Sequence, residues 1–133
     1  MTIMLADTLP ASCTERLERA GHTVHIAASL KGDALIAAIG AKQPTVLVVR
    51  STKVSAAAME ANPHLELIVR AGAGFDTIDV NAASERGIFV ANCPGKNADA
   101  VAELAIGLML ALDRRLPDNV ADARAGTWNK GRY

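Results

Sequence analysis

Short apolar runs alternate along the chain with longer, alanine-rich segments in which polar residues are interspersed. The run TVLVV at residues 45–49 is continuous and β-branched, which is typical of a strand buried on both faces. Similar runs elsewhere complete the set of predicted strands. These strands are residues 2–6, 23–27, 45–49, 65–69 and 88–91.

Helices are predicted between the strands, at residues 11–20, 32–40, 55–61 and 80–85. Gly21 and Gly87 follow the first and the last of them, where a glycine favours a helix end. Alternating buried strands and helices are the signature of a parallel sheet with helices on both faces. Since right-handed crossovers leave few topologies, we predict an α/β fold, a flavodoxin-like, doubly wound parallel sheet.

The last part of the chain is predicted to be helical, at residues 97–116 and 118–125. Apolar residues between Val101 and Leu112 cover nearly the whole circumference of the first helix, which is typical of a buried helix. The sheet has other helices on its faces and can bury only one side of this one. We therefore predict a sheet domain, residues 1–96, and an interdomain or dimerisation region, residues 97–133, that needs a partner.

Composition narrows the class of protein. Of the 133 residues, 50% are apolar and 3% aromatic, so the core consists mainly of aliphatic side chains. The 14 basic and 14 acidic residues balance, which argues against a nucleic-acid partner. Neither a signal peptide nor a run of about 18 apolar residues occurs, and two cysteines make no disulfide framework. We expect a cytoplasmic protein with no membrane partner.

The segment RAGAG at residues 70–74 follows the fourth predicted strand. Its two glycines match the start of a dinucleotide fingerprint, but Thr77 stands at the third glycine position and no helix follows at once. We therefore reject a nucleotide site there. The glycines still let the backbone approach a ligand, and successive N–H groups can bind an anion. A tight turn without a ligand is the alternative.

The segment RSTK at residues 50–53 follows the third predicted strand, at the same sheet edge as the glycine turn. Ligands of open α/β sheets bind at this carboxyl edge. Arg50 offers a planar fork that matches carboxylate or phosphate. Ser51 and Thr52 are either hydroxyl donors to a ligand or caps of the next helix. The alternative is a capped helix beside a solvated arginine.

Residues 92–97, NCPGKN, form a third loop at this edge, and Asn97 can cap the long helix. Catalytic candidates are weak, because Cys93 has no evident histidine partner and the three histidines lack metal-ligand spacing. Asp7 ends the first strand, as acids do in phospho-acceptor receiver domains. Such a domain needs an aspartate where Arg50 stands, so we reject that interpretation.

Several spaced motifs together carry a family resemblance: R-S-T-K, R-A-G-x-G-x-D-x-I-D, A-S-E-R-G-I, N-x-P-G-x-N and A-E-L. The combination is far more specific than any one motif. From about residue 45 to its end, the chain resembles D-3-phosphoglycerate dehydrogenases and their D-2-hydroxyacid dehydrogenase relatives. Before residue 45, only the alternation of strands and helices matches.

The resemblance implies a flavodoxin-like substrate domain interrupted by a Rossmann domain that binds NAD, with the substrate between them. The backbone at Ala73 and Gly74 then holds the substrate carboxylate, and Ala73 also approaches the nicotinamide. Arg50 and Ser51 approach the carboxylate or phosphate end of the substrate, and Asn97 lines the cleft. The NAD-binding domain and the catalytic arginine, glutamate and histidine are expected beyond residue 133, so no catalytic or metal-binding residue is assigned here.

The helix from Asn97 resembles the family's interdomain helix at the dimer interface, and Trp128 resembles the tryptophan that inserts at the partner subunit. Two local departures occur. Many members have a residue between the serine and threonine of R-S-T-K, and Ala98 replaces a frequent serine.

We therefore expect the substrate-binding part of an NAD-dependent oxidoreductase, acting on an acid such as 3-phosphoglycerate in serine biosynthesis. The chain alone is expected to be inactive and to form a homodimer through residues 97–116. One alternative is a stand-alone flavodoxin-like module that binds a small carboxylate or phosphate and homodimerises. Another is an interaction-only remnant without a ligand.

Overall fold

The computed structural model describes residues 1–132, which form two compact units. The first unit is Met1–Pro94 and the second begins at Gly95. The first contains five strands and four helices, and the second contains two helices.

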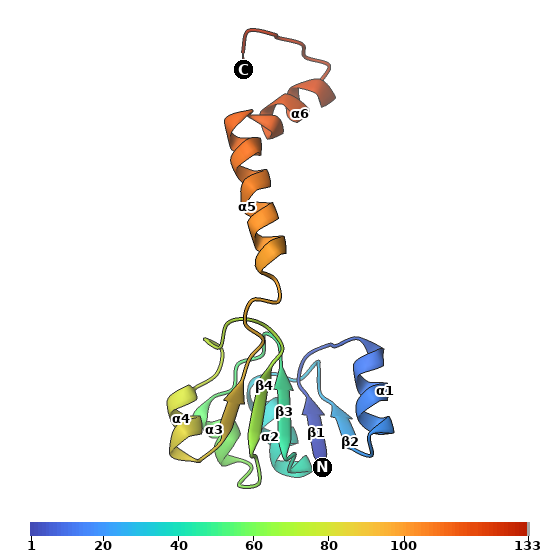
Figure 1. Ribbon diagram of the computed structural model, residues 1–133, viewed down its shortest axis with the longest axis vertical. Helices are drawn as coiled ribbons and strands as arrows, with labels where there is room; N and C mark the ends of the chain where they lie inside the picture. The colour runs from blue at the N-terminus through green and yellow to red at the C-terminus, as the bar shows by residue number, and fades with distance from the viewer. Residues whose placement is uncertain (133) are drawn as a thin grey trace. The chain divides into compact units, whose positions relative to one another are not determined.

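A parallel sheet is the centre of the first unit (Figure 1). Its strands are β1 (Thr2–Leu5), β2 (Thr23–Ile26), β3 (Val46–Val49), β4 (Leu67–Arg70) and β5 (Phe89–Ala91). All pair in parallel, in the order β2-β1-β3-β4-β5. This order is that of flavodoxin-like folds, with a topological switch point between β1 and β3. The predicted fold class is thereby confirmed.

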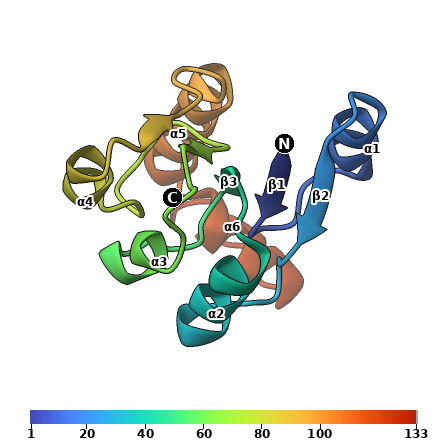
Figure 2. The same ribbon diagram turned by 90° about the horizontal axis from the view of Figure 1, so that it is seen from below.

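Helices cover both faces of the sheet. They are α1 (Ala11–Arg19), α2 (Gly32–Lys42), α3 (Ala56–Glu60) and α4 (Val80–Glu85). Viewed from below, α1 lies on one side of the sheet, and α2 and α3 lie on the other (Figure 2). Right-handed crossovers explain the split, because the connection from β1 to β2 runs in the opposite direction to those that follow.

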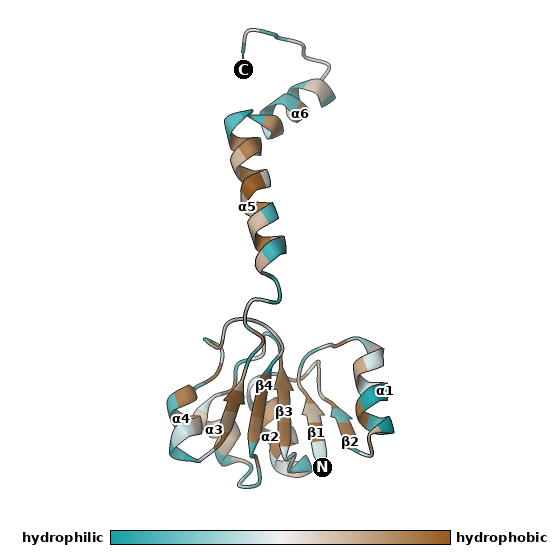
Figure 3. Cartoon of the chain, in the orientation of Figure 1, coloured by the Kyte–Doolittle hydropathy of each residue, from teal (hydrophilic) through white to brown (hydrophobic). Residues whose placement is uncertain are grey.

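Side chains that alternate along the strands build the core on each face. Ile3, Leu5 and Val46 form a small cluster, against which the half-buried Leu17 of α1 packs. The larger cluster, on the other face, includes Leu47. Because both faces are buried, the strands read as continuous apolar runs, brown in Figure 3.

The end of α2 differs from its prediction. The helix continues past Gly40 to Lys42 and ends at Gln43, whose φ of 45° is left-handed. The side-chain amide of Gln43 donates to the carbonyl oxygens of Gly40 at 2.7 Å and Ala61 at 3.0 Å. These bonds support a backbone conformation that glutamine rarely adopts.

The second unit consists of α5 (Ala98–Asp113) and α6 (Leu116–Arg124). The predicted helix over residues 97–116 is interrupted because Arg115 has a left-handed φ of 48°. No residue of α5 is buried among the described residues, and burial of one side of this helix against the sheet stays a prediction. Its large apolar side chains are between 54% and 81% exposed. No helix within residues 1–132 is long and apolar enough to cross a membrane.

Candidate functional site

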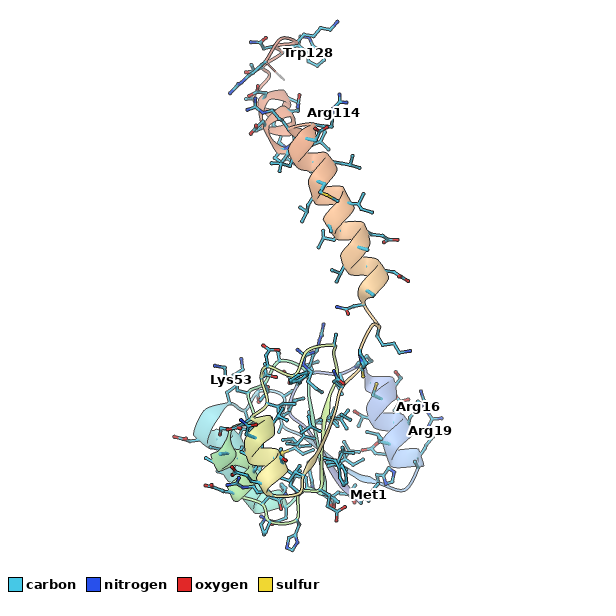
Figure 4. The ribbon with its side chains drawn as sticks, turned by 60° about the vertical axis from the view of Figure 1, so that its left-hand side comes forward. Met1, Arg16, Arg19, Lys53, Arg114 and Trp128 are labelled. Carbon is cyan, nitrogen blue, oxygen red and sulfur yellow. The ribbon has the colours of Figure 1, made fainter. Side chains whose placement is uncertain are left out.

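Two loops leave the carboxyl ends of the neighbouring strands β3 and β4 and are tied together. Val54 and Ile78 form an isolated parallel bridge. The N–H of Val54 donates to Thr77 at 2.9 Å, and the N–H of Asp79 donates to Val54 at 3.0 Å. Figure 4 shows Lys53 at this edge of the sheet, with Met1 at the opposite edge. The predicted meeting of the two loops is thereby confirmed.

Asp7, at the end of β1, fixes the first loop. Its Oδ2 accepts hydrogen bonds from the backbone N–H groups of Arg50, Ser51 and Thr52, at 2.6, 3.1 and 3.1 Å. Its Oδ1 accepts a hydrogen bond from the Ser51 hydroxyl at 3.1 Å. Three successive N–H groups converging on one oxygen form an anion-binding nest. A carboxylate of the chain itself therefore fills the nest that follows β3.

The hydrogen bonds also set the charge of Asp7. Burial alone would raise the pKa of its carboxyl, but the donors on Arg50, Thr52 and Ser51 outweigh burial and lower the pKa from 3.8 to about 2. Asp7 is therefore ionised at neutral pH, and an ionised carboxylate only accepts hydrogen bonds. The acid that resembled a receiver-domain residue is a structural anion.

Hydroxyl groups of this loop have roles other than helix capping. Thr52 is only 6% exposed, and its hydroxyl donates to the carbonyl of Ala6 at 3.3 Å. The cap of α3 is instead Ser55, which accepts from the N–H of Ala58. The interpretation of Ser51 and Thr52 as caps is therefore wrong.

The side chain of Arg50 is available for a ligand. Arg50 is exposed, and within residues 1–132 its guanidinium makes no ion pair or hydrogen bond. Its backbone N–H is fixed by Asp7. An anchored backbone that carries an unpaired guanidinium is a suitable arrangement for recognising an anion.

Hydrogen bonds fix the glycine turn, residues 70–74, at the end of β4. The N–H of Ala71 donates to Val49 at 2.7 Å, and the N–H of Gly72 donates to Arg70 at 2.8 Å. Asn92 donates through Nδ2 to the carbonyl of Ala73 at 2.7 Å. Nε of Arg70 is buried without a hydrogen-bond partner among the described residues. Sequence reasoning did not single out Arg70, although its position at the end of β4 was a signal.

Backbone donors remain open beyond this turn. The N–H groups of residues 73–77 reach no acceptor within the part of the chain that the structure describes. Residues 73–76 are exposed, so these groups are accessible to a ligand. Open N–H groups at the carboxyl edge can bind a carboxylate.

A dinucleotide does not fit this turn. The next helix, α4, begins only at Val80 and has six residues. The carboxylate of its N-cap residue Asp79 accepts from the N–H of Ala82 at 3.0 Å. A negative charge therefore occupies the helix N-terminus where a pyrophosphate would bind.

Two further candidate residues from the sequence are Asn97 and Cys93. Asn97 stands at the N-cap position of α5, in the second unit, but its side chain makes no capping hydrogen bond. Cys93 is a half-buried free thiol. No group of three or more histidine, cysteine, aspartate or glutamate residues able to hold a metal ion occurs within residues 1–132.

Comparisons with known proteins identify relatives of the chain. The chain is 42% identical over 132 residues to D-3-phosphoglycerate dehydrogenase from Methanocaldococcus jannaschii, covering 98% of this chain and 25% of that protein. It is 52% identical over 86 residues to hydroxypyruvate reductase from Thermotoga maritima, covering 64% of this chain and 28% of that protein. The chain thus spans about a quarter of the length of these curated relatives.

Solved structures show the same fold. An NAD-dependent formate dehydrogenase from Staphylococcus aureus, in complex with NAD, superimposes with a TM-score of 0.83 at 27% identity. The match covers 97% of this chain and 43% of that one. Residues 3–128 match the sequence profile of the D-isomer specific 2-hydroxyacid dehydrogenase catalytic domain. The chain therefore belongs to the D-isomer specific 2-hydroxyacid dehydrogenase family.

Proposed function

We propose that this chain is the substrate-binding part of an NAD-dependent D-2-hydroxyacid dehydrogenase that acts on D-3-phosphoglycerate. The observation that carries the proposal is that two sets of hydrogen-bond donors at one sheet edge lack acceptors. The Arg50 guanidinium and the N–H groups of residues 73–77 have no acceptor among the described residues. An acid with two anionic groups supplies acceptors for both sets.

The charges at this edge favour phosphoglycerate over hydroxypyruvate, which the Thermotoga maritima relative is named for. Arg70 is paired in register with Val49, so Arg50 and Arg70 lie at adjacent positions of neighbouring strands. Neither guanidinium has an acidic partner within residues 1–132. Two arginines without acidic partners at one edge of the sheet suit a phosphate in addition to a carboxylate.

The roles of the individual residues follow from this placement. The backbone of Ala73 and Gly74 would hold the carboxylate, and Arg50, with Ser51 beside it, would face the rest of the acid. Asn97 would line the cleft, and Ala73 would approach the nicotinamide. In the whole enzyme, bound NAD would supply a hydride acceptor for C2 of the acid. The described residues supply recognition, since they offer no dinucleotide site.

Calorimetric titration of the chain tests this proposal. We expect D-3-phosphoglycerate to bind, hydroxypyruvate to bind more weakly, and NAD alone not to bind. Arg50→Ala should weaken phosphoglycerate binding by about tenfold or more, the scale of a charge-assisted hydrogen bond. Arg16→Ala, on α1 (Figure 4), is the control and should leave affinity unchanged. Absence of binding, or an equal effect of both variants, would contradict the proposal.

Activity gives an independent measurement. We expect the 133-residue chain to produce no NADH from phosphoglycerate and NAD, because the glycine turn among the described residues does not fit a dinucleotide. Measurable NADH formation by the pure chain would contradict the proposal that this chain recognises the acid but does not carry out hydride transfer.

A second candidate is a stand-alone module that binds a small carboxylate or phosphate and homodimerises. The exposed apolar side chains of α5 favour a self-associating protein. The coding sequence downstream of residue 133 distinguishes the candidates. A strand followed by G-x-G-x-x-G would support the dehydrogenase, whereas a stop codon would support the module.

A further inference from the structure

We infer that Asp7 is a positioning residue for the substrate's anion, because it occupies the three backbone N–H groups and the Ser51 hydroxyl of the Arg50–Thr52 loop and leaves the Arg50 guanidinium free. The inference rests on the proposed function and adds a residue to it. Asp7 lies 43 residues from Arg50 in the chain, on the other side of the topological switch point.

The first step concerns the backbone donors. The N–H groups of Arg50, Ser51 and Thr52 all donate to Oδ2 of Asp7. An anion that enters this edge finds the nest after β3 already filled. It can therefore bind to the loop only through side chains.

The second step concerns the Ser51 hydroxyl. Asp7 is ionised, so the hydrogen bond of 3.1 Å between Oγ of Ser51 and Oδ1 of Asp7 uses the single Ser51 proton. Towards a ligand, the Ser51 oxygen is then an acceptor. An acceptor repels a carboxylate or phosphate oxygen, so Arg50 is the attractive group of the loop.

The third step concerns geometry. Arg50 has a long, flexible side chain that is exposed, and only its backbone is fixed by Asp7. Without Asp7, three neighbouring N–H groups lose their acceptor and the loop can relax or capture a solvent anion. Asp7 thus holds the Arg50 backbone in place and prevents the nest from binding the substrate in a second, unproductive position.

Replacing Asp7 in two ways separates positioning from simple stabilisation. In Asp7→Ala the nest is empty. In Asp7→Asn the amide oxygen can accept from the three N–H groups, and the amide nitrogen can donate to Ser51. The Ser51 proton is then free to meet an anion. The probe is D-3-phosphoglycerate, titrated into the chain by calorimetry, with urea unfolding of each variant.

The two Asp7 variants should change probe affinity in opposite directions. Asp7→Ala should bind the probe about tenfold more weakly, the scale of one lost charge-assisted contact, and formate at the empty nest should restore part of the affinity. Asp7→Asn should bind more tightly than wild type. Ser51→Ala should weaken binding in the Asp7→Asn background but not in the wild-type background, a coupling that a merely structural role does not produce.

The matched control is a variant that lowers the free energy of unfolding through a change at the opposite edge of the sheet. Asn62→Ala removes the hydrogen bonds of Asn62 with Pro44 and His64 without touching the Arg50 loop, so it should leave probe affinity unchanged. If Asp7→Ala binds as wild type does, or if Asn62→Ala weakens binding equally, the inference is overturned and the proposed function stands. If wild type does not bind the probe, both fail. Should Asp7→Ala not fold, weaker binding by Asp7→Asn overturns the inference by itself.

Discussion

The guanidinium of Arg70 lies directly against the α-carbon of Gly72. A β-carbon on residue 72 would overlap Nη1 of Arg70 and come within 2.8 Å of its Cζ. Gly72 does not have a positive φ, so the absence of a side chain matters here for space and not for backbone conformation. The turn that carries the open N–H groups and the arginine that ends β4 are therefore fitted to each other.

Gly72→Ala should displace Arg70 without unfolding the chain. The overlapping atoms are the far end of a flexible side chain, so we expect a stability change below about 1 kcal/mol. Phosphoglycerate affinity should fall by about tenfold, because a cation leaves the site. Urea unfolding and calorimetry measure the two effects. In an Arg70→Ala background the Gly72→Ala loss should disappear, and persistence of the full loss would show that Arg70 is not its cause.

Acid should destabilise the chain through Asp7. Its pKa in the fold, about 2, is below the value of 3.8, so its contribution is complete above about pH 4 and is lost as pH falls towards 2. Allowing for solvent screening, we expect about 1–2 kcal/mol from this group. Urea unfolding between pH 2 and 5 measures it. Asp7→Asn should show a flatter profile, and identical slopes for both proteins would contradict the assignment.

The sheet was predictable because buried parallel strands leave continuous apolar runs and glycines mark helix ends. Val80–Glu85 agrees with its prediction at both ends. The fourth strand was placed too early, at Leu65. Leu65 is buried, but its N–H donates to Asn62 in a turn, and β4 begins at Leu67. Burial without alternation does not distinguish a strand from a buried turn.

The site was predictable only in part. Parallel topology brings the loops after β3 and β4 to one edge, which sequence reasoning anticipated. It did not anticipate that Asp7 fills the nest of Arg50, Ser51 and Thr52, because this contact joins residues more than 40 positions apart. Local patterns predict helices and turns, whereas such a contact depends on the order of strands in the finished sheet.

Arg50→Lys tests whether the planar guanidinium of Arg50 matters for binding in addition to its positive charge. Lysine keeps the charge but cannot form two parallel hydrogen bonds to one carboxylate or phosphate. We expect a loss of phosphoglycerate affinity of about three- to tenfold, smaller than for Arg50→Ala. Because the guanidinium has no described partner, unfolding in urea should change by less than about 0.5 kcal/mol. Equal affinity of the lysine variant would show that only charge matters.

Asn62→Ala should be among the more destabilising polar substitutions. Asn62 is 1% exposed, donates to Pro44 at 2.7 Å and accepts from the N–H of His64 at 2.9 Å. Removing it leaves the buried carbonyl of Pro44 and the part-buried N–H of His64 unpaired, at a cost of about 2 kcal/mol. The exposed Asn81 of α4 is the matched control, and Asn81→Ala should change stability by less than about 0.5 kcal/mol. Similar urea midpoints for both variants would contradict the role of Asn62.

The apolar surface of α5 should make the chain self-associate. Its exposed residues include Leu104, Leu108 and Leu112, and such a surface is unfavourable in water (Figure 3). We expect a homodimer by light scattering coupled to size exclusion. The double variant Leu104→Glu, Leu108→Glu should be monomeric, because two charges cannot be buried unpaired in an apolar contact. Glu103→Gln, on the same helix, is the control and should stay dimeric. A monomeric wild-type chain at high concentration would show that α5 is covered by something other than a second copy.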